Sequence, residues 1–413
     1  MKRMVIPSLL MTILTVGCAS TLPLQKTDDL TVRARALAVQ SIIVDTHVDV
    51  PYRLEKEWED ISRATEGGDF DYPRALQGGL NAPFMSIYTP AKLQEEGGSK
   101  ELADRLIDMV EGFETNWPEK FSVARSVADV REDFAAGLIS LPMGMENGTP
   151  IGTDLENLRH FFNRGIRYVT LAHSKWNAIS DSSYDDDRHW EGLSPFGRQV
   201  VPEMNRLGMM IDISHLTDAA SLQVLELSTA PVIASHSSCR AFTLEWERNM
   251  SDEVLVALAD NGGVIHINFG SSFLTEPARE ASRKMGDAVD AFQDEHEYAD
   301  DDEAVEAFRD NYREEHPPVL AELSDVVDHI DHVVSLVGID HVGIGSDYDG
   351  VGPTTPVGLE DVSHYPDLIR ELLERGYPDD HVKKIMGENT LRVWEEVELV
   401  SSSQASEGRE TRP

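Results

Sequence analysis

Histidine and acidic side chains close four short apolar stretches of the chain. These stretches end in residues 45–49 (DTHVD), 144–148 (GMENG), 213–215 (ISH) and 234–237 (ASHS). In a β-strand, side chains two residues apart point to the same face, so His47 and Asp49 can bind one metal ion together. Imidazole and carboxylate groups suit zinc, and a glutamate such as Glu146 can bridge two ions. The residue types and their spacing therefore indicate a hydrolase with two metal ions.

Eight apolar runs predict the strands that would position these side chains. The runs are residues 41–49, 82–88, 138–146, 165–173, 208–215, 231–236, 263–269 and 341–347. They are mostly continuous, which is typical of parallel strands covered on both faces. Helical patterns separate them, as at residues 155–164, 196–207, 218–227 and 252–261. The alternation predicts an α/β fold, a (β/α)8 TIM barrel. The alternative is a doubly wound open sheet, but no glycine-rich phosphate loop follows the first strand.

The candidate residues all fall at the carboxyl ends of predicted strands, where barrel enzymes place their active sites. They are Asp49, Glu146, His173, His215, His236 and Asp347, after the first, third, fourth, fifth, sixth and eighth strands. A single histidine in such a place is more often a hydrogen-bonded core residue than a ligand. The placement shared by all six favours one common site.

Several motifs give the chain a resemblance to a known family. They are HVD (47–49), MENG (145–148), SH (214–215), SHS (235–237) and GSDYDG (345–350), with GLSPFG (192–197) between them and GLEDV (358–362) after them. In this order they resemble the membrane (renal) dipeptidases, peptidase family M19. That family consists of binuclear zinc peptidases with a barrel of the metal-dependent hydrolase (amidohydrolase) type. The resemblance runs from about residue 42 to residue 397.

The resemblance implies two zinc ions per subunit, with a ligand set that can be assigned residue by residue. His47 and Asp49 would hold one ion, His215 and His236 the other, and Glu146 would bridge them. A water between two such ions is available as hydroxide near neutral pH. The implied enzyme is thus a metallo-dipeptidase that cleaves an amide with a metal-bridging hydroxide.

The resemblance also implies roles for three further side chains. Asp347 would carry a proton from the water to the leaving amine. His173 would stabilise the developing oxyanion, and Arg248 would receive the free carboxylate of the substrate. Arg240 lies close by in the sequence and is the alternative for that last role. Asp45, two residues before His47, is expected to support that ligand and not to bind metal.

The expected substrates are small dipeptides, including those with a D-residue at the C-terminal position. One alternative is another barrel amidohydrolase, a deaminase or a lactonase, whose substrates often lack a free carboxylate. A second alternative is a non-catalytic binding lipoprotein that has kept the fold. The family is often dimeric, so a homodimer is also an expectation.

The composition excludes one class of partner. The 413 residues include 36 basic and 74 acidic ones, a net charge of −38. Such a surface repels the phosphates of nucleic acids, so no nucleic-acid partner is expected. Only Cys239 of the two cysteines lies in the globular body, which predicts no internal disulfide.

The two ends of the chain differ from its body. Residues 1–18 resemble a bacterial lipoprotein signal peptide, with Lys2 and Arg3 before an apolar stretch and Cys18 as the mature, lipidated N-terminus. The alternative is an ordinary secretory peptide cut near Ala19. Residues 19–31 read as a tether, 32–400 as the barrel with an acidic helical insertion at about 275–318, and 401–413 as a disordered tail. The expected location is the bacterial cell envelope, lipid-anchored or periplasmic.

If Cys18 is lipidated, the exported protein should partition with membranes, and Cys18→Ser should release it or leave it unprocessed. The reason is that two acyl-bearing groups on one residue give stable anchoring, whereas a single chain does not. Fractionation of expressing bacteria into membranes and soluble material measures the effect. Wild-type protein that is wholly soluble after export would favour the ordinary secretory peptide.

Overall fold

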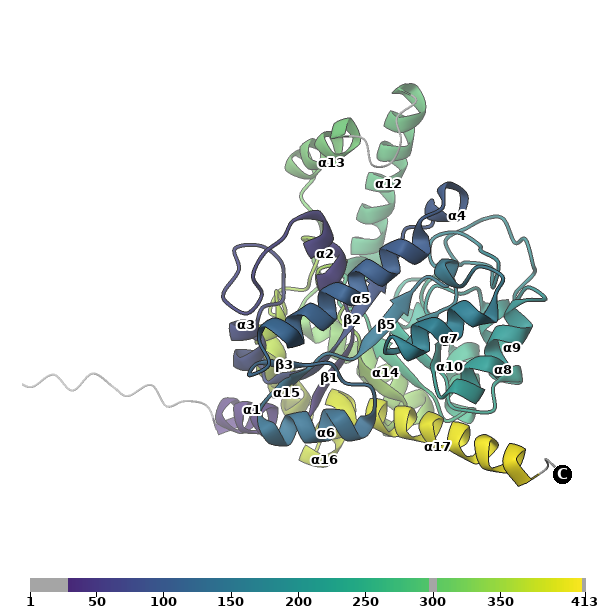
Figure 1. Cartoon of the computed structure of the whole chain (residues 1–413). Coiled ribbons are helices and arrows are strands. Elements are labelled where there is room, and N and C mark those ends of the chain that lie inside the picture. The colour runs from purple at the N-terminus through teal and green to yellow at the C-terminus, as the bar shows by residue number, and fades with distance from the viewer. Residues whose placement is uncertain (1–28, 297–302, 411–413) are drawn as a thin grey trace, which may run out of the picture.

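Eight parallel strands close into a barrel (Figure 1). The computed structural model describes residues 29–296 and 303–410, so the predicted signal peptide and most of the tether lie outside the described residues. Around the barrel the strand order is β1-β10-β9-β8-β7-β6-β5-β2. The strands are β1 Ile43–Val48, β2 Leu80–Tyr88, β5 Met143–Glu146, β6 Ile166–Thr170, β7 Met210–Asp212, β8 Ile233–Ser237, β9 Val264–Ile267 and β10 Val342–Ile344. Each overlaps one predicted run, so the predicted TIM barrel is confirmed.

The third predicted run is divided between two strands. Its first part is β4, Ile139–Ser140, which pairs with β3, Phe121–Ser122, in a separate two-stranded sheet. Pro142 follows and has no backbone N–H to donate, while its carbonyl accepts from the N–H of Met85 at 2.8 Å. The chain then enters the barrel as β5, which ends on Glu146.

Helices fill the segments between strands. Those before the insertion are α1 Asp29–Gln40, α2 Val50–Lys56, α3 Tyr72–Gly78, α4 Leu93–Glu96, α5 Ser99–Asn116, α6 Val127–Ala136, α7 Leu155–Asn163, α8 Gly197–Leu207, α9 Asp218–Leu227, α10 Asp252–Asp260 and α11 Ser271–Leu274. After it come α14 Leu323–Val337, α15 Tyr365–Glu374, α16 Asp379–Lys383 and α17 Asn389–Glu410. Helices α7 to α10 match the four predicted ones. Thr217 and Ser251 begin α9 and α10 by accepting backbone N–H bonds, as N-cap residues do.

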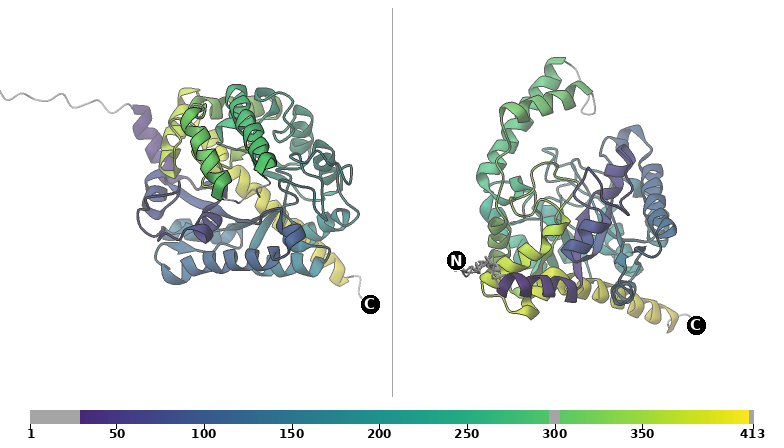
Figure 2. Two further views of the ribbon diagram at one scale, coloured as in Figure 1. Left: turned by 90° about the horizontal axis from the view of Figure 1, so that it is seen from above. Right: turned by 90° about the vertical axis from the view of Figure 1, so that its left-hand side faces the viewer.

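The insertion, predicted as acidic and helical, forms two helices, α12 Glu276–His296 and α13 Glu303–Glu315. Both stand outside the ring of barrel helices, above the end of the barrel opposite α17 (Figures 1 and 2). Helix α13 has an apolar stripe that includes Val305 and Phe308, and this stripe packs within the chain. Phe308 stacks on Phe292 of α12 with ring centroids 4.3 Å apart, and Val305 is buried. The stripe is therefore used to hold the two helices together.

Helix α17 closes the other end of the barrel (Figure 1). Its Trp394 is fully buried, with its ring 5.4 Å from that of Phe84 on β2. The helix continues to Glu410, so the prediction of a disordered tail is wrong for residues 401–410. The physical reason lies in tertiary bonds, because Ser401 donates to the carbonyl of Arg206 and Gln404 to the hydroxyl of Thr229. Over the residues described, no helix has the length and apolar character needed to cross a membrane.

Candidate metal centre

The predicted site residues meet at one end of the barrel, but several lie beyond the strands. His173, His215 and Asp347 each follow the last residue of their strand by three positions. His215 has φ 69° and Asp347 has φ 63°, which no extended strand contains. The sequence-based strand ends were therefore too late at these places. His215 and Asp347 lie in the turns that follow the strands, and in this left-handed conformation their side chains border the cavity above the barrel.

The carboxylate of Glu146 lies at the centre of the cluster. Its Oε2 is 3.4 Å from Nε2 of His47. Its Oε1 is 3.2 Å from Nε2 of His215, 3.3 Å from that of His236 and 3.4 Å from that of His173. The two oxygens thus face different histidines. This is the arrangement that a carboxylate needs in order to bridge two ions.

Hydrogen bonds inside the barrel orient His47. The hydroxyl of Tyr168 donates to the carbonyl of Thr46 at 2.9 Å, so at 2.8 Å it accepts from Nδ1–H of His47. That protonation leaves the lone pair on Nε2, which is buried and makes no hydrogen bond. A Cβ on Gly144 would lie 1.9 Å from the Tyr168 ring, so only glycine leaves room for it. A histidine held by Nδ1 is prepared to bind metal through Nε2.

His236 is oriented in the same way. The hydroxyl of Ser235 donates to Asp212 at 2.6 Å and accepts from Nδ1 of His236 at 2.7 Å. Asp212 is fully buried and also accepts the backbone N–H groups of Ser214 and Ser235. Nε2 of His236 then lies 2.8 Å from Nε2 of His215.

The donor set fits a pair of divalent ions. In three groups of side chains, the donor atoms lie within 4.8 Å of one another. The groups are His47 with Glu146 and His236, Glu146 with His173 and His215, and His47 with Asp49 and Asp347. Burial lowers the pKa of His215 and of His236 well below the usual value, which keeps both rings neutral as metal ligands require. Glu146 belongs to two groups, so the geometry supports a binuclear centre that shares this residue.

Asp347 faces the same cluster from the turn after β10. Its Oδ2 accepts from the side-chain amide of Asn268 at 2.7 Å. Burial raises the pKa of Asp347 well above the usual value, and the carboxylates of Asp49 and Glu146 raise it further. A Cβ on Gly350 would lie 2.2 Å from Asp347 Oδ1 and 2.3 Å from Asp49 Oδ2. The glycine therefore lets the turn close against both carboxylates.

The two candidate arginines have different surroundings. Arg248 is only 3% exposed. Its guanidinium donates to Ser237 Oγ and to the carbonyl of His236, both at 2.8 Å. Its Nη2 lies 3.1 Å from Nε2 of His215. Arg240 binds both oxygens of Asp218, at 2.7 and 2.6 Å, outside the cavity. Of the two arginines, Arg248 is the one that borders the metal centre.

Asp45 supports the site from outside the cavity. It is fully buried and accepts the backbone N–H of His47 at 3.1 Å and that of Ser346 at 2.9 Å. Its carboxylate also binds the hydroxyls of Ser346 and of Tyr365 on α15. Asp45 thus ties β1 to the end of β10, in agreement with the supporting place expected from the sequence.

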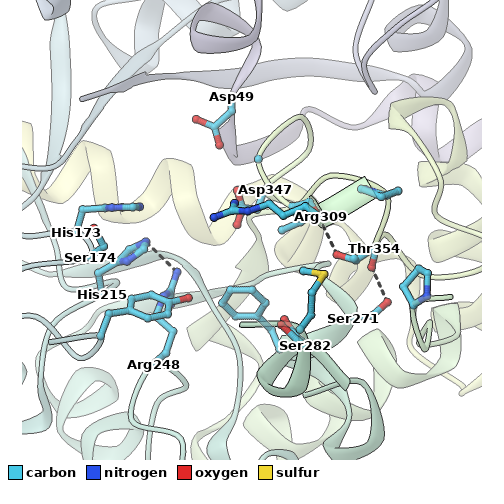
Figure 3. Close-up of a pocket in the computed structure, with 18 of the residues that line it drawn as sticks. Asp49, His173, Ser174, His215, Arg248, Ser271, Ser282, Arg309, Asp347 and Thr354 are labelled. Carbon is cyan, nitrogen blue, oxygen red and sulfur yellow. Dashed lines mark hydrogen bonds between the residues drawn. The ribbon is translucent and has the colours of Figure 1, made fainter. Parts of the chain in front are cut away.

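The metal centre opens into a cavity of about 1370 Å³ (Figure 3). Asp49, His173, His215, Arg248 and Asp347 border it, as Figure 3 shows. The opposite wall comes from the insertion, with Ser282 and Met285 of α12 and Arg309 and Tyr312 of α13 among its residues. The predicted surface insertion therefore forms part of the wall of the site.

The barrel and the cluster of histidine and acidic donors define a candidate metal-dependent hydrolase. Residues 31–408 match the family model described as membrane dipeptidase (peptidase family M19). A curated relative, Dipeptidase verJ from Clonostachys rogersoniana, is 34% identical over 398 residues, which are 93% of this chain and 91% of that one. The chain belongs to the membrane dipeptidase family M19, and it is a metallo-dipeptidase of that family.

Solved structures resemble the chain over nearly their whole length. The probable dipeptidase PvdM from Pseudomonas aeruginosa is 29% identical, with a TM-score of 0.78 over 90% of this chain and 99% of that one. A metallopeptidase from Rhodobacter sphaeroides, liganded with a phosphinate mimic of the dipeptide L-Ala-D-Ala, is 26% identical, with a TM-score of 0.71 over 86% and 99%.

Sequence reasoning missed three residues that hold the ligands. Ser235 stands next to His236, so its hydroxyl was a visible candidate for a supporting bond. Tyr168 and Asp212 lie inside apolar strand runs far from the motifs that they support. A buried acid or phenol in a parallel strand is unusual, and that was the only local sign of their roles.

Tyr168→Phe should weaken metal binding about 10- to 100-fold. The substitution removes the hydroxyl that holds Nδ1 of His47 but keeps the aromatic ring of residue 168. Titration of the metal-free protein with zinc measures the affinity. Tyr377→Phe is the control, since the Tyr377 hydroxyl binds Asp331 away from the site. Equal affinities for wild type and Tyr168→Phe would contradict the orienting role.

Proposed function

We propose that the protein is a zinc-dependent dipeptidase that hydrolyses the single amide bond of dipeptides, including those with a C-terminal D-residue. The observation that carries this proposal is the buried Arg248 beside Glu146 and His215 in one cavity. A fixed cation next to a binuclear centre suits a substrate whose free carboxylate lies close to the bond that is cleaved.

His47 and Asp49 would hold one ion and His215 and His236 the other, with Glu146 shared between them. Imidazole and carboxylate donors favour zinc, although such a set also accepts manganese or cobalt. When bound, the two ions supply an activated water and polarise the substrate carbonyl. The residues themselves contribute neutral nitrogen donors and a fixed spacing, since Tyr168 and Ser235 hold the rings.

Asp347 would take the proton of the attacking water and pass it to the leaving amine. Its raised pKa, caused first by burial, lies in the direction that a proton carrier requires. His173 borders the cavity with Nε2 3.4 Å from Glu146, where its N–H can donate to the substrate oxygen as negative charge develops.

The guanidinium of Arg248 would bind the C-terminal carboxylate of the dipeptide. Phe273 lies under it, with the ring centroid 5.0 Å from Cζ, and fixes the plane of the fork. The phosphinate mimic of L-Ala-D-Ala in the Rhodobacter sphaeroides relative supports acceptance of a C-terminal D-residue. A deaminase or lactonase is the alternative within the fold, and its substrates would leave Arg248 without a carboxylate.

We also propose that the protein is exported and held at the bacterial cell envelope through Cys18. The support is the sequence alone, a basic start followed by an apolar stretch and the cysteine. Assembly as a homodimer is proposed on the family resemblance.

Asp347→Asn should keep about two zincs per chain but reduce kcat by roughly 10²- to 10⁴-fold, because the amide cannot take up the proton. Metal analysis and steady-state kinetics on one L,L and one L,D dipeptide measure the two effects. Normal turnover in this variant would remove Asp347 from the proposed role.

A dipeptide should be cleaved by the wild type, while its C-terminal amide should be nearly inert. Arg248→Ala should lower kcat/KM for the dipeptide on the order of tenfold to a few hundredfold, since charge-assisted bonds are worth about 1.5–3 kcal/mol. The amide should lose much less. Arg240→Ala is the matched control and should leave the ratio of acid to amide unchanged. Equal wild-type rates for acid and amide would discard the dipeptidase in favour of another amidohydrolase.

A further inference from the structure

The turn that carries Asp347 contains two non-glycine residues in left-handed backbone conformation. Asp347 has φ 63° and Asp349 has φ 66°, with Tyr348 between them. Such conformations are strained for residues that have a Cβ, and they persist only where surrounding contacts impose them. The contacts of this turn therefore decide where the carboxylate of Asp347 stands.

Reciprocal hydrogen bonds join Asp349 to Asp69. The backbone N–H of Asp349 donates to Oδ2 of Asp69 at 2.9 Å, and that of Asp69 donates to Oδ1 of Asp349 at 2.6 Å. The second oxygen of Asp349 accepts from Nε of Arg53 at 3.0 Å. The Asp349 side chain is 0% exposed. Both carboxylate oxygens of Asp349 therefore accept hydrogen bonds, and the guanidinium of Arg53 compensates the buried charge.

Arg53 connects this pair to the other side of the metal centre. It lies on α2, which begins directly after Asp49. Its Nη1 donates to Glu59 at 2.6 Å and its Nη2 to the carbonyl of Phe70 at 3.3 Å, so the guanidinium is held in place by the loop after α2. The ion pair thus ties the segment that bears Asp49 to the turn that bears Asp347.

We propose that Asp349 is a positioning residue for Asp347. Together with Arg53 and Asp69, it holds the strained turn closed so that the Asp347 carboxylate faces the metal centre. Asp349 acts through the backbone of the turn and through no contact with the ligand histidines. This inference rests on the proposed function, because it explains how the proton carrier of that reaction is placed.

Hydrogen–deuterium exchange of the full-length protein tests the turn without any need for activity. In Asp349→Asn the side chain keeps its size but loses the charge that binds Arg53. The amides of Gly350 and Val351 donate to the carbonyl of Asp347, at 3.0 and 3.2 Å. A peptide covering residues 345–352 should exchange faster in the variant, while a peptide from β6 should not change. Unchanged exchange in the turn would overturn the proposal.

Kinetics test the consequence for the reaction. Asp349→Asn should lower kcat for a dipeptide about 10- to 100-fold, with KM and zinc content close to wild type, because the ligands and Arg248 are intact. Arg53→Lys should give a similar loss. The double variant should lose little more than the larger single one, since the two side chains act as a unit. Full kcat in Asp349→Asn, or a loss that follows zinc content, would overturn the proposal.

Glu55→Gln is the matched control. Glu55 lies on the same helix as Arg53 but pairs with Arg105, at 3.1 Å, so its loss leaves the Arg53 guanidinium in place, and kcat and exchange at residues 345–352 should stay near wild type. If Asp349→Asn does not fold, Arg53→Lys, whose side chain is 16% exposed, carries both measurements. A wild type that cleaves no dipeptide would reject the proposed function, and exchange in the turn would still decide the positioning role.

Discussion

The carboxylate of Glu146 is nearly buried and is surrounded by four imidazole rings at 3.2 to 3.4 Å. Burial raises its pKa, but the histidines around it, with His47 the largest contributor, bring the pKa well below the usual value. An uncompensated carboxylate in such a place would be costly, so it needs cations beside it, and the Nε2 atoms around it are placed where they could hold them. The barrel meets this constraint by bringing histidines from four different strand ends to one point.

A set of buried hydrogen bonds beneath the centre makes that arrangement specific. Tyr168 and Ser235 each hold the Nδ1 of one histidine, so the Nε2 atoms face Glu146. Asp212 and Asp45 fix the backbone, because each carboxylate accepts N–H groups from two neighbouring strand ends. The regular strands end here in turns. Side-chain acceptors take over the backbone donors that would otherwise be buried without partners.

The α12–α13 insertion shapes the space above the centre. With it, the cavity of about 1370 Å³ exceeds the roughly 300–1,000 Å³ that hold drug-sized ligands. The side chains that meet a substrate away from the metals therefore come partly from residues outside the catalytic motifs.

The sequence by itself determined the barrel and predicted the candidate metal ligands. Apolar runs and helical periodicity are local properties, and the ligand residues stand in short motifs at the ends of those runs. The exact strand ends could not be predicted from the sequence, because His215 and Asp347 adopt a left-handed backbone conformation that tertiary contacts impose. Helix α17 also continued past residue 401 because of contacts with distant segments.

Only the tertiary structure decided which residues hold the ligands and which arginine borders the centre. His47 and Tyr168 are 121 positions apart, and Asp69 and Asp349 are 280 apart. Nothing in a local pattern links such pairs, since their partners are chosen by the closure of the barrel. Arg240 and Arg248 are alike in type and neighbourhood, and they differ because Asp218 of α9 binds the first. The chemistry of each side chain is set by its residue type, whereas the pairing of side chains depends on where the folded chain brings them together.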